Sequence, residues 1–138
     1  MSVCWHPDGS SVFGGGSDST IRKYDIKDFS NSLVIKSQFK LSTIIWSITV
    51  LRYFRIKDCK LTYNSDNTII SGDSLGNTQF WDGNQGVLMY GWKQHEADVL
   101  SVVANERLGV AFSSGIDSKV VLFQLVKENV CELFILSF

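Results

Sequence analysis

The side chains that could transfer protons or hold a metal ion are few in this chain of 138 residues, which has two histidines and three cysteines. His95 and Asp117 could together form a catalytic dyad, because a carboxylate can orient a histidine that acts as a general base. His6 lies in the turn sequence 6–9, where we expect an exposed loop side chain rather than a ligand. No Cys-x-x-Cys pair and no calcium-loop pattern occurs in the sequence. We therefore predict no enzyme activity, no cofactor, no metal and no small-molecule substrate.

A second candidate surface is the basic and aromatic segment 52–64. Its net charge is positive, because one acidic residue stands against four basic ones: Arg52, Arg55, Lys57 and Lys60. Three aromatic residues are interleaved with them: Tyr53, Phe54 and Tyr63. Basic side chains combined with stacking aromatic rings can bind single-stranded RNA. A solvated loop is the alternative interpretation of this segment, and we favour it over an RNA or partner contact.

Composition indicates a folded protein inside the cell. The chain is 44% hydrophobic and 20% charged, with 13 basic and 14 acidic residues and a formal net charge of -1. This balance disfavours a broad cationic face for nucleic acid, because such affinity comes mostly from neutralising phosphates. No apolar run approaches the roughly 18 residues that cross a bilayer, so we expect no membrane partner. Widely spaced cysteines, odd in number, favour reduced thiols in an intracellular compartment: Cys4, Cys59 and Cys131.

Three segments of the sequence share one pattern. In each, small residues and a turn rich in Gly, Ser, Asp or Asn precede a strand that ends in an aromatic residue. Tyr24, Trp81 and Phe123 therefore fall in register. The second and third segments are 42 residues apart, which fits a repeat of roughly 40–45 residues, whereas the first and second are 57 apart. Removing an insertion at 52–64 restores the period.

Short alternating strands and turn clusters fill the rest of the sequence, with no convincing helix. We assign four strands to each repeat and predict an all-β chain of about three four-stranded antiparallel sheets. The repeats cover about 1–38, about 39–92 with the insertion 52–64, and about 93–138. The apolar tail, 130–138, needs another surface to cover it.

These repeats resemble WD40 repeats, whose markers are a Gly-His pair before the first strand and Trp-Asp after the third. Trp81-Asp82 matches the second marker, while Tyr24-Asp25 and Phe123-Gln124 are degenerate forms of it. The resemblance implies that the chain forms WD40 β-propeller blades. It also implies structural roles for the marker residues Tyr24, Asp25, Trp81, Asp82 and Phe123.

The histidine of the first marker is His95, which follows Gln94 in place of glycine. In the second repeat Leu41 holds this position. WD40 blades pair the histidine with a turn aspartate, and the resemblance assigns that role to Asp117. It therefore favours a buried hydrogen-bond network at His95 and Asp117 over a catalytic dyad.

Nearly the whole chain is also similar to the N-terminal propeller of the cirhin family, through segments 2–9, 44–48, 65–82 and 97–101, although the insertion 52–64 departs from that family. The resemblance implies a non-catalytic scaffold in ribosome biogenesis, acting in the small-subunit processome during pre-rRNA processing and maturation of small-subunit rRNA. It implies residence in the nucleus and nucleolus, protein subunits of the processome as partners, and mostly indirect association with pre-rRNA. A generic WD40 protein–protein interaction module, such as a ubiquitin-ligase substrate receptor or a trafficking scaffold, is the alternative.

Three repeats are too few to close a ring, because propellers close with about four to eight blades. We therefore expect an interior fragment of a longer protein, or less readily a chain that assembles with copies of itself. Expressed alone, the chain should be oligomeric or aggregated.

Overall fold

The computed structural model describes residues 2–36, 42–52, 67–124 and 133–137, and all the regular structure in these ranges is β-strand. The strands form three four-stranded antiparallel sheets, each running in sequence order from one edge to the other. The prediction of an all-β chain with about three such sheets is therefore confirmed. In the described part of the chain, no helix has the length and apolar character that a membrane crossing requires.

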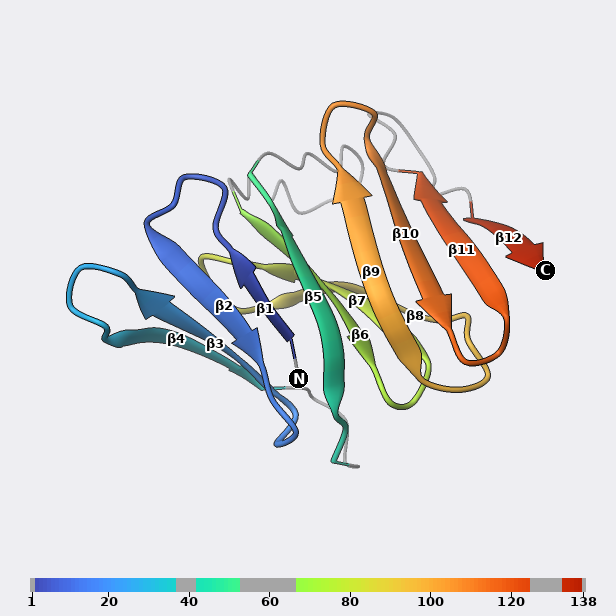
Figure 1. Ribbon diagram of the computed structural model, residues 1–138, viewed down its shortest axis with the longest axis horizontal. Coiled ribbons are helices and arrows are strands. Elements are labelled where there is room, and N and C mark those ends of the chain that lie inside the picture. Colours follow the sequence, from blue (N-terminus) through green and yellow to red (C-terminus); the bar gives the residue numbers. More distant parts are fainter. Residues whose placement is uncertain (1, 37–41, 53–66, 125–132, 138) are drawn as a thin grey trace.

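Each sheet is a meander of consecutive strands (Figure 1). The first sheet contains β1 (Ser2–Trp5), β2 (Ser11–Gly15), β3 (Thr20–Asp25) and β4 (Asn31–Lys36). The second contains β5 (Ile45–Leu51), β6 (Thr68–Asp73), β7 (Asn77–Asp82) and β8 (Leu88–Lys93). The third contains β9 (Val99–Asn105), β10 (Val110–Gly115), β11 (Lys119–Gln124) and β12 (Leu133–Ser137). The apolar tail of the sequence thus supplies the last strand of the third sheet.

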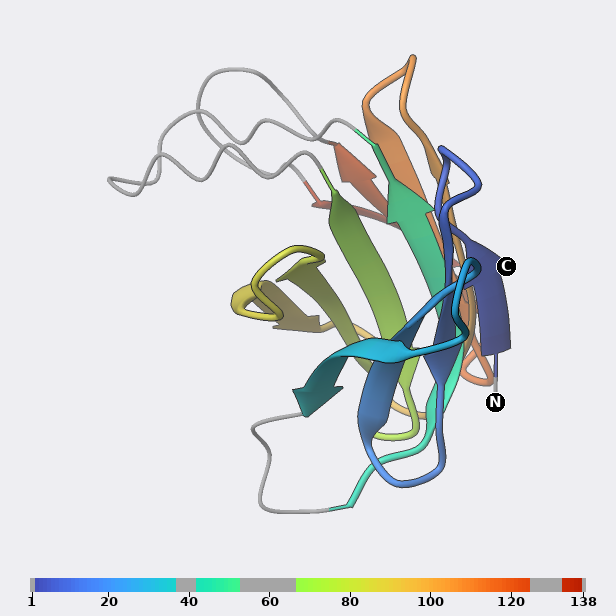
Figure 2. The same cartoon turned by 90° about the vertical axis from the view of Figure 1, so that its left-hand side faces the viewer.

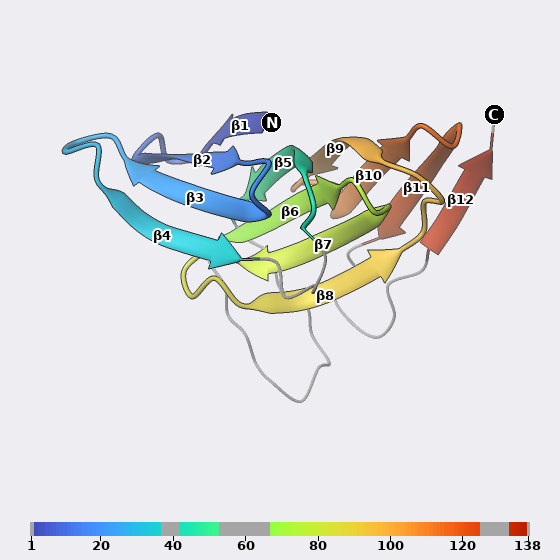
Figure 3. The same cartoon turned by 90° about the horizontal axis from the view of Figure 1, so that it is seen from below.

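The three sheets lie side by side (Figure 3), and the first strand of the second sheet, β5, lies between β1 and β9. In Figure 2 the strands of the second sheet follow one another from β5 to β8. Successive side chains of a strand point to opposite faces of its sheet. The second sheet is therefore covered on both faces, and every residue of β6 and β7 is buried.

Two apolar clusters fill the spaces between the sheets. Phe13, Ile21 and Ile35 of the first sheet pack with Ile69 and Trp81 of the second. On the opposite face of the second sheet, Leu51, Ile70 and Phe80 pack with the third sheet through a set that includes Val99, Val102, Ala111, Val121 and Phe123. Neighbouring apolar residues of β6 and β7 thus belong to different cores: Ile69 and Trp81 face the first sheet, and Ile70 and Phe80 face the third.

The turns between the second and third strands share one backbone feature. Ser19, Gly76 and Ser118 occupy equivalent positions and have φ values of 62°, 87° and 59°. The left-handed region favours glycine, and at Gly76 a second reason requires it. A Cβ there would lie 2.2 Å from the carbonyl oxygen of His95. This turn therefore lies directly against the connection that enters the third sheet.

Candidate functional site: polar networks and joints between the sheets

His95 lies in the connection from β8 to β9 and is 1% exposed. Its Nδ1 is 2.8 Å from Asp117 Oδ1, and its Nε2 is 2.8 Å from Ser113 Oγ. A general base must reach the proton that it abstracts. Both ring nitrogens of His95 are engaged inside the protein, so this arrangement holds the β8–β9 connection onto the third sheet and offers no open position to a substrate.

The pKa of Asp117 reflects two opposing influences. Burial raises it, but hydrogen bonds from His95 and from the backbone N–H groups of Glu96 and Lys119 outweigh burial and hold the pKa below its ordinary value. An ionised carboxylate only accepts hydrogen bonds, so His95 Nδ1 donates to Asp117. Asp117 therefore fixes the orientation of the imidazole ring.

The three aromatic positions lie in the third strand of their sheets, at the same register. Tyr24 pairs with Val12, Trp81 with Ile69, and Phe123 with Ala111. Their environments differ, because Trp81 and Phe123 are each 1% exposed and Tyr24 is 38% exposed. Trp81 and Phe123 therefore pack in the interfaces between neighbouring sheets, which we call joints. Tyr24 lies on the uncovered face of the first sheet.

A serine in the second strand takes a different partner in each of two sheets. Trp81 Nε1 donates to Ser71 Oγ at 2.9 Å in the second sheet. In the third sheet the equivalent serine, Ser113, bonds to His95, and Phe123 stands where the tryptophan would be. Each buried serine thus has one polar partner, tryptophan or histidine, as buried polar groups require.

Asp25 and Asp82 stabilise the turns that follow them. Asp82 is 3% exposed, and its Oδ1 accepts from the N–H groups of Asn84 at 2.8 Å and Gln85 at 3.0 Å. Asp25 Oδ1 accepts from the N–H of Lys27 at 2.8 Å. Aspartate commonly bonds the backbone two residues ahead in this way, so both side chains shape the connection to the outer strand.

His6 is buried, contrary to the expectation of an exposed loop residue. It is 5% exposed, and its Nε2 is 2.5 Å from Asn67 Oδ1, immediately before β6. Its Nδ1 lies 2.5 Å from Asp8 Oδ1. The expectation was wrong because the turn that contains His6 folds against the second sheet, through a partner 61 residues away in the sequence.

Asp73 is a buried polar residue that sequence reasoning missed. It is 0% exposed, and its carboxylate accepts from the N–H groups of Leu75 and Asn77, both at 2.9 Å, and from the Asn77 side chain. These bonds stabilise the β6–β7 turn of the second sheet. The Asp-x-x-x-Asn spacing was the available signal. Leu41, predicted to replace the histidine of this sheet, lies outside the described residues.

Serine side chains connect the first strands of neighbouring sheets, β1, β5 and β9, which we call the innermost strands. Ser2 Oγ of β1 accepts from the N–H of Ile48 in β5 at 3.3 Å, and Ser47 Oγ of β5 accepts from the N–H of Val102 in β9 at 3.0 Å. Ser2 and Ser47 are in equivalent positions, since they pair with Gly15 and Gly72 of the following strand. One atomic contact is therefore repeated at both joints.

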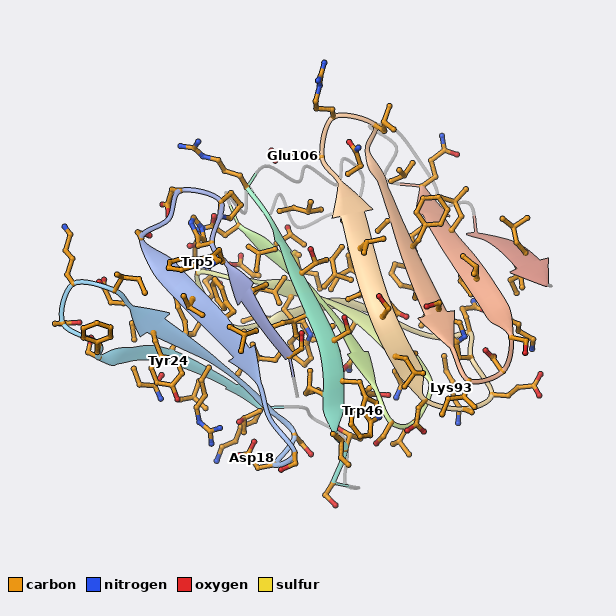
Figure 4. All side chains as sticks on the ribbon, in the orientation of Figure 1. Trp5, Asp18, Tyr24, Trp46, Lys93 and Glu106 are labelled. Atoms are coloured by element: carbon orange, nitrogen blue, oxygen red, sulfur yellow. The ribbon has the colours of Figure 1, made fainter. Side chains whose placement is uncertain are left out.

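Glycine in the second strand lets the next sheet approach. A Cβ at Gly15 would lie 2.6 Å from Ile45 Cγ2, and a Cβ at Gly72 would lie 2.5 Å from Val99 Cγ1. Ile45 and Val99 are the first residues of β5 and β9. The second joint has a further bond, from Trp46 Nε1 to Asp98 Oδ2 at 2.8 Å, near the start of β5 (Figure 4).

Only Arg52 of the predicted basic surface lies within the described residues, where it is exposed at the end of β5. Arg55, Lys57 and Lys60 lie outside them, so an RNA or partner contact there stays a prediction. Within 2–36, 42–52, 67–124 and 133–137, no three His, Cys, Asp or Glu side chains gather as a metal site would require.

Similarity to solved structures defines the class of fold. The chain superposes on the WD40 repeats of RRP9 with a TM-score of 0.73 and 16% identity, covering 96% of this chain and 37% of that one. The three sheets are therefore blades of the WD40 β-propeller type, as predicted. No family model matches the chain.

Proteins of similar sequence are also found. The chain is 28% identical over 130 residues to U3 small nucleolar RNA-associated protein 4 of Saccharomyces cerevisiae, covering 89% of this chain and 15% of the relative. It is 30% identical over 132 residues to the Homo sapiens homolog of that protein, covering 91% of this chain and 17% of the relative. The chain thus spans about a sixth of the length of these relatives.

Proposed function

We propose that the chain is part of a non-catalytic WD40 scaffold that acts in ribosome biogenesis, within the small-subunit processome of the nucleolus. One observation carries the proposal: similarity to U3 small nucleolar RNA-associated protein 4 extends over about nine-tenths of the chain in two distant organisms. The scaffold would hold protein subunits of the processome during pre-rRNA processing and maturation of small-subunit rRNA.

The geometry supports rigid display as the mechanism. The residues best suited to chemistry, His6 and His95, are buried and bonded to neighbouring side chains. The strands fix the positions of the turns at the ends of each sheet, and partners can dock on such turns without chemical change. A formal net charge of -1 is compatible with indirect association with pre-rRNA through proteins.

An affinity-tagged chain expressed in cells tests the proposal. We expect nucleolar accumulation, and co-purification of U3 small nucleolar RNA together with processome proteins. Proteins should remain bound after ribonuclease treatment, because the proposed contacts are between proteins. Diffuse distribution, or enrichment of ubiquitin-ligase or trafficking subunits in place of processome proteins, would instead favour a generic WD40 interaction module.

A charge-reversal pair distinguishes direct from indirect RNA contact. One variant carries glutamate at Arg52, Arg55, Lys57 and Lys60. The matched control carries glutamate at four exposed basic residues elsewhere: Lys27, Lys36, Lys93 and Arg107. If the insertion binds RNA, only the first variant should lose RNA crosslinking while keeping its protein partners. Equal crosslinking of both variants would remove the RNA role of the segment.

A further inference from the structure

The outer edge of the second sheet is open. β8 pairs with β7 on one side, and no described strand pairs with it on the other. Figure 3 shows β8 at the outer margin of the three sheets. The second sheet has a neighbour on each of its faces, so further sheets in a longer chain would lie beyond the first or third sheet. The open edge of β8 therefore does not follow from where the sequence begins or ends.

Hydrogen bonds at the end of β7 show which of its backbone groups face β8. The N–H of Asp82 donates to the carbonyl oxygen of Val87, on the side of β8, at 2.8 Å. The N–H of Gly83 donates to the carbonyl oxygen of Asn67, on the side of β6, also at 2.8 Å. Backbone groups of successive residues point to opposite sides of a strand. The even-numbered residues of β7 therefore direct their N–H and C=O groups toward β8.

The same alternation places the backbone of Gly91 at the open edge. Thr78 and Phe80, which face β8, are the register partners of Trp92 and Tyr90. Gly91 lies between these two partners, so its N–H and C=O point away from β7. An edge of this kind is a template for pairing with another extended chain.

Gly91 is a glycine that the fold itself does not require. It is exposed, and its φ lies outside the left-handed region. A Cβ there would lie 3.8 Å from Gln79 Cγ and 4.0 Å from Leu88 Cδ2, which are ordinary contact distances. Glycine inside a strand weakens it and often marks a site where a ligand or another backbone approaches closely. The reason for Gly91 therefore lies outside the packing of this chain.

A buried amide without a partner lies next to Gly91. Gln79 of β7 is the register partner of Gly91 and is 0% exposed. Within the part of the chain that the structure describes, neither its Nε2 nor its Oε1 has a hydrogen-bond partner. Buried polar groups are normally paired. The equivalent residue of the third sheet is Val121, since both residues pair with the serine of the second strand, so the repeat does not need an amide here.

The two neighbours of Gly91 present aromatic rings on the other face of the sheet. Tyr90 and Trp92 stack with their ring centroids 5.4 Å apart and an interplanar angle of 6°. Both residues are half-buried, and Trp92 also packs edge-on against Phe80 of the core at 5.4 Å. The rings are therefore held in place by the core while part of their surface stays accessible.

We infer that the edge of β8 binds an extended peptide segment of a partner protein as a fifth strand of the second sheet. In this mode of recognition, main-chain hydrogen bonds supply affinity and alternate side chains supply specificity. The outward N–H and C=O of Gly91 pair with one residue of the segment. The side chain of that residue lies over Gly91, beside Gln79, and its two neighbours lie beside Tyr90 and Trp92. This inference does not depend on the proposed function, because it follows from the edge alone.

The side chains around this edge specify the chemistry of the segment. Apolar side chains suit the two ring positions, because aromatic and β-branched residues on neighbouring strands stabilise each other. Between them, a glutamine side chain lies over Gly91, where β8 presents no side chain. Its amide donates to Oε1 and accepts from Nε2 of Gln79 when that amide turns toward the edge. A register shift between Phe80 and Trp81 limits the regular edge to residues 90–93, which suits a short segment better than the edge of a second copy.

Fluorescence anisotropy with a labelled synthetic peptide tests the site. The probe is Lys-Thr-Val-Gln-Val-Thr-Lys, whose glutamine lies opposite Gly91 and whose valines lie beside the two rings. We expect saturable binding to the chain. The same peptide with proline in place of glutamine should bind about tenfold more weakly, because it lacks the N–H that pairs with Gly91. Absence of saturable binding, or equal binding of the two peptides, would overturn the inference.

A proline and alanine pair at Gly91 tests the edge itself. Gly91→Pro removes the outward N–H, and an edge strand tolerates proline where its nitrogen faces solvent. Gly91→Pro should therefore weaken binding by about tenfold. Gly91→Ala is the matched control: it keeps the N–H and its Cβ meets only ordinary contacts, so affinity should stay within about threefold. Circular dichroism checks that both variants keep their sheets, and equal affinities would contradict strand addition.

Gln79→Val tests the specificity and leaves the backbone of the edge intact. It copies Val121 and removes the unpaired amide, so the chain should be at least as stable as the wild type. The wild type should prefer the glutamine peptide to one with alanine at that position by about threefold or more, and Gln79→Val should bind both equally. A preference that persists would overturn the assigned pattern. If Gly91→Pro does not fold, this variant and the proline peptide decide the question.

Light scattering on the chain without peptide excludes the other occupant of the edge. Gly91→Pro should leave the mass of the chain unchanged. A fall in mass would show that the edge pairs with a second copy and would overturn the inference. These outcomes are independent of the cellular tests, because a chain that binds the peptide but does not accumulate in the nucleolus would refute the scaffold role alone.

Discussion

The hydrogen bond between His95 and Asp117 should be among the strongest single polar contributions to the stability of this chain. Asp117→Ala leaves the buried Nδ1 of His95 without its acceptor, 2.8 Å away in the native structure. A hydrogen bond to a charged group contributes about 1.5–3 kcal/mol, and an unsatisfied buried donor costs about 1–3 kcal/mol. We therefore expect Asp117→Ala to lower the free energy of unfolding by about 3 kcal/mol.

A double-mutant cycle in urea isolates this bond from the other effects. His95→Ala should cost about 3–5 kcal/mol, because it also leaves Ser113 without its partner and opens a cavity. If the two side chains act through each other, the double variant should lose about 1.5–3 kcal/mol less than the sum of the single variants. Glu96→Ala is the control, since it removes only the ion pair of an 80% exposed side chain with Lys119 and should cost less than about 1 kcal/mol. An interaction energy below about 0.5 kcal/mol would refute the reasoning.

The same carboxylate gives the prediction a pH dependence. The pKa of Asp117 is lowered in the folded chain, so the unfolded chain binds the proton more readily. The stabilisation is fully present above the ordinary aspartate pKa of about 3.9 and is lost as pH falls through the lower folded value. Asp117→Asn should therefore show a shallower loss of stability on acidification, and an unchanged slope would contradict the assignment.

Three further experiments probe the joints and the half-buried Cys4 thiol. Trp81→Phe should cost about 1–3 kcal/mol in urea unfolding, because the Ser71 hydroxyl loses its donor; a stability equal to wild type would show that this bond is dispensable. Gly72→Ala should cost about 1–3 kcal/mol, because its Cβ would lie 2.5 Å from a methyl carbon of β9, whereas Gly14→Ala meets nothing within 4 Å and should be much milder. Burial raises the pKa of the Cys4 thiol to about 11, so iodoacetamide at pH 8 should label Cys4 far more slowly in the folded chain than in urea, as peptide mass spectrometry can measure; equal rates would contradict the burial.

Local patterns were sufficient to predict the sheets. The turn residues before Tyr24, Trp81 and Phe123, followed by alternating strands, place these three rings at one register, and the paired strands show that register directly. Strand alternation and turn chemistry act over a few residues, so they are visible in a single sequence. The repeat boundaries and the basic segment 52–64 stay predictions.

Contacts between sheets could not be predicted from the same patterns. His6 was expected to be exposed because its own turn sequence says nothing about Asn67, which bonds to it from the segment just before β6. Ser2 and Ser47 look like ordinary strand residues until β1, β5 and β9 are placed side by side. Their signal was present only as a serine repeated at the same place in each innermost strand, with Ser101 as the third member.

The contrast between the middle and outer sheets determines what this chain can do. The second sheet is buried on both faces, while the first and third each keep one apolar face exposed, as Val3 and Val103 show. The polar side chains that could take part in chemistry, such as His95 and Asp117, form hydrogen bonds within the protein. Any further sheet that docks on an outer face therefore supplies the burial that the second sheet already has, and its binding free energy adds to the stability of the fold. At both outer sheets, docking of a further sheet is thus coupled to the stability of the fold.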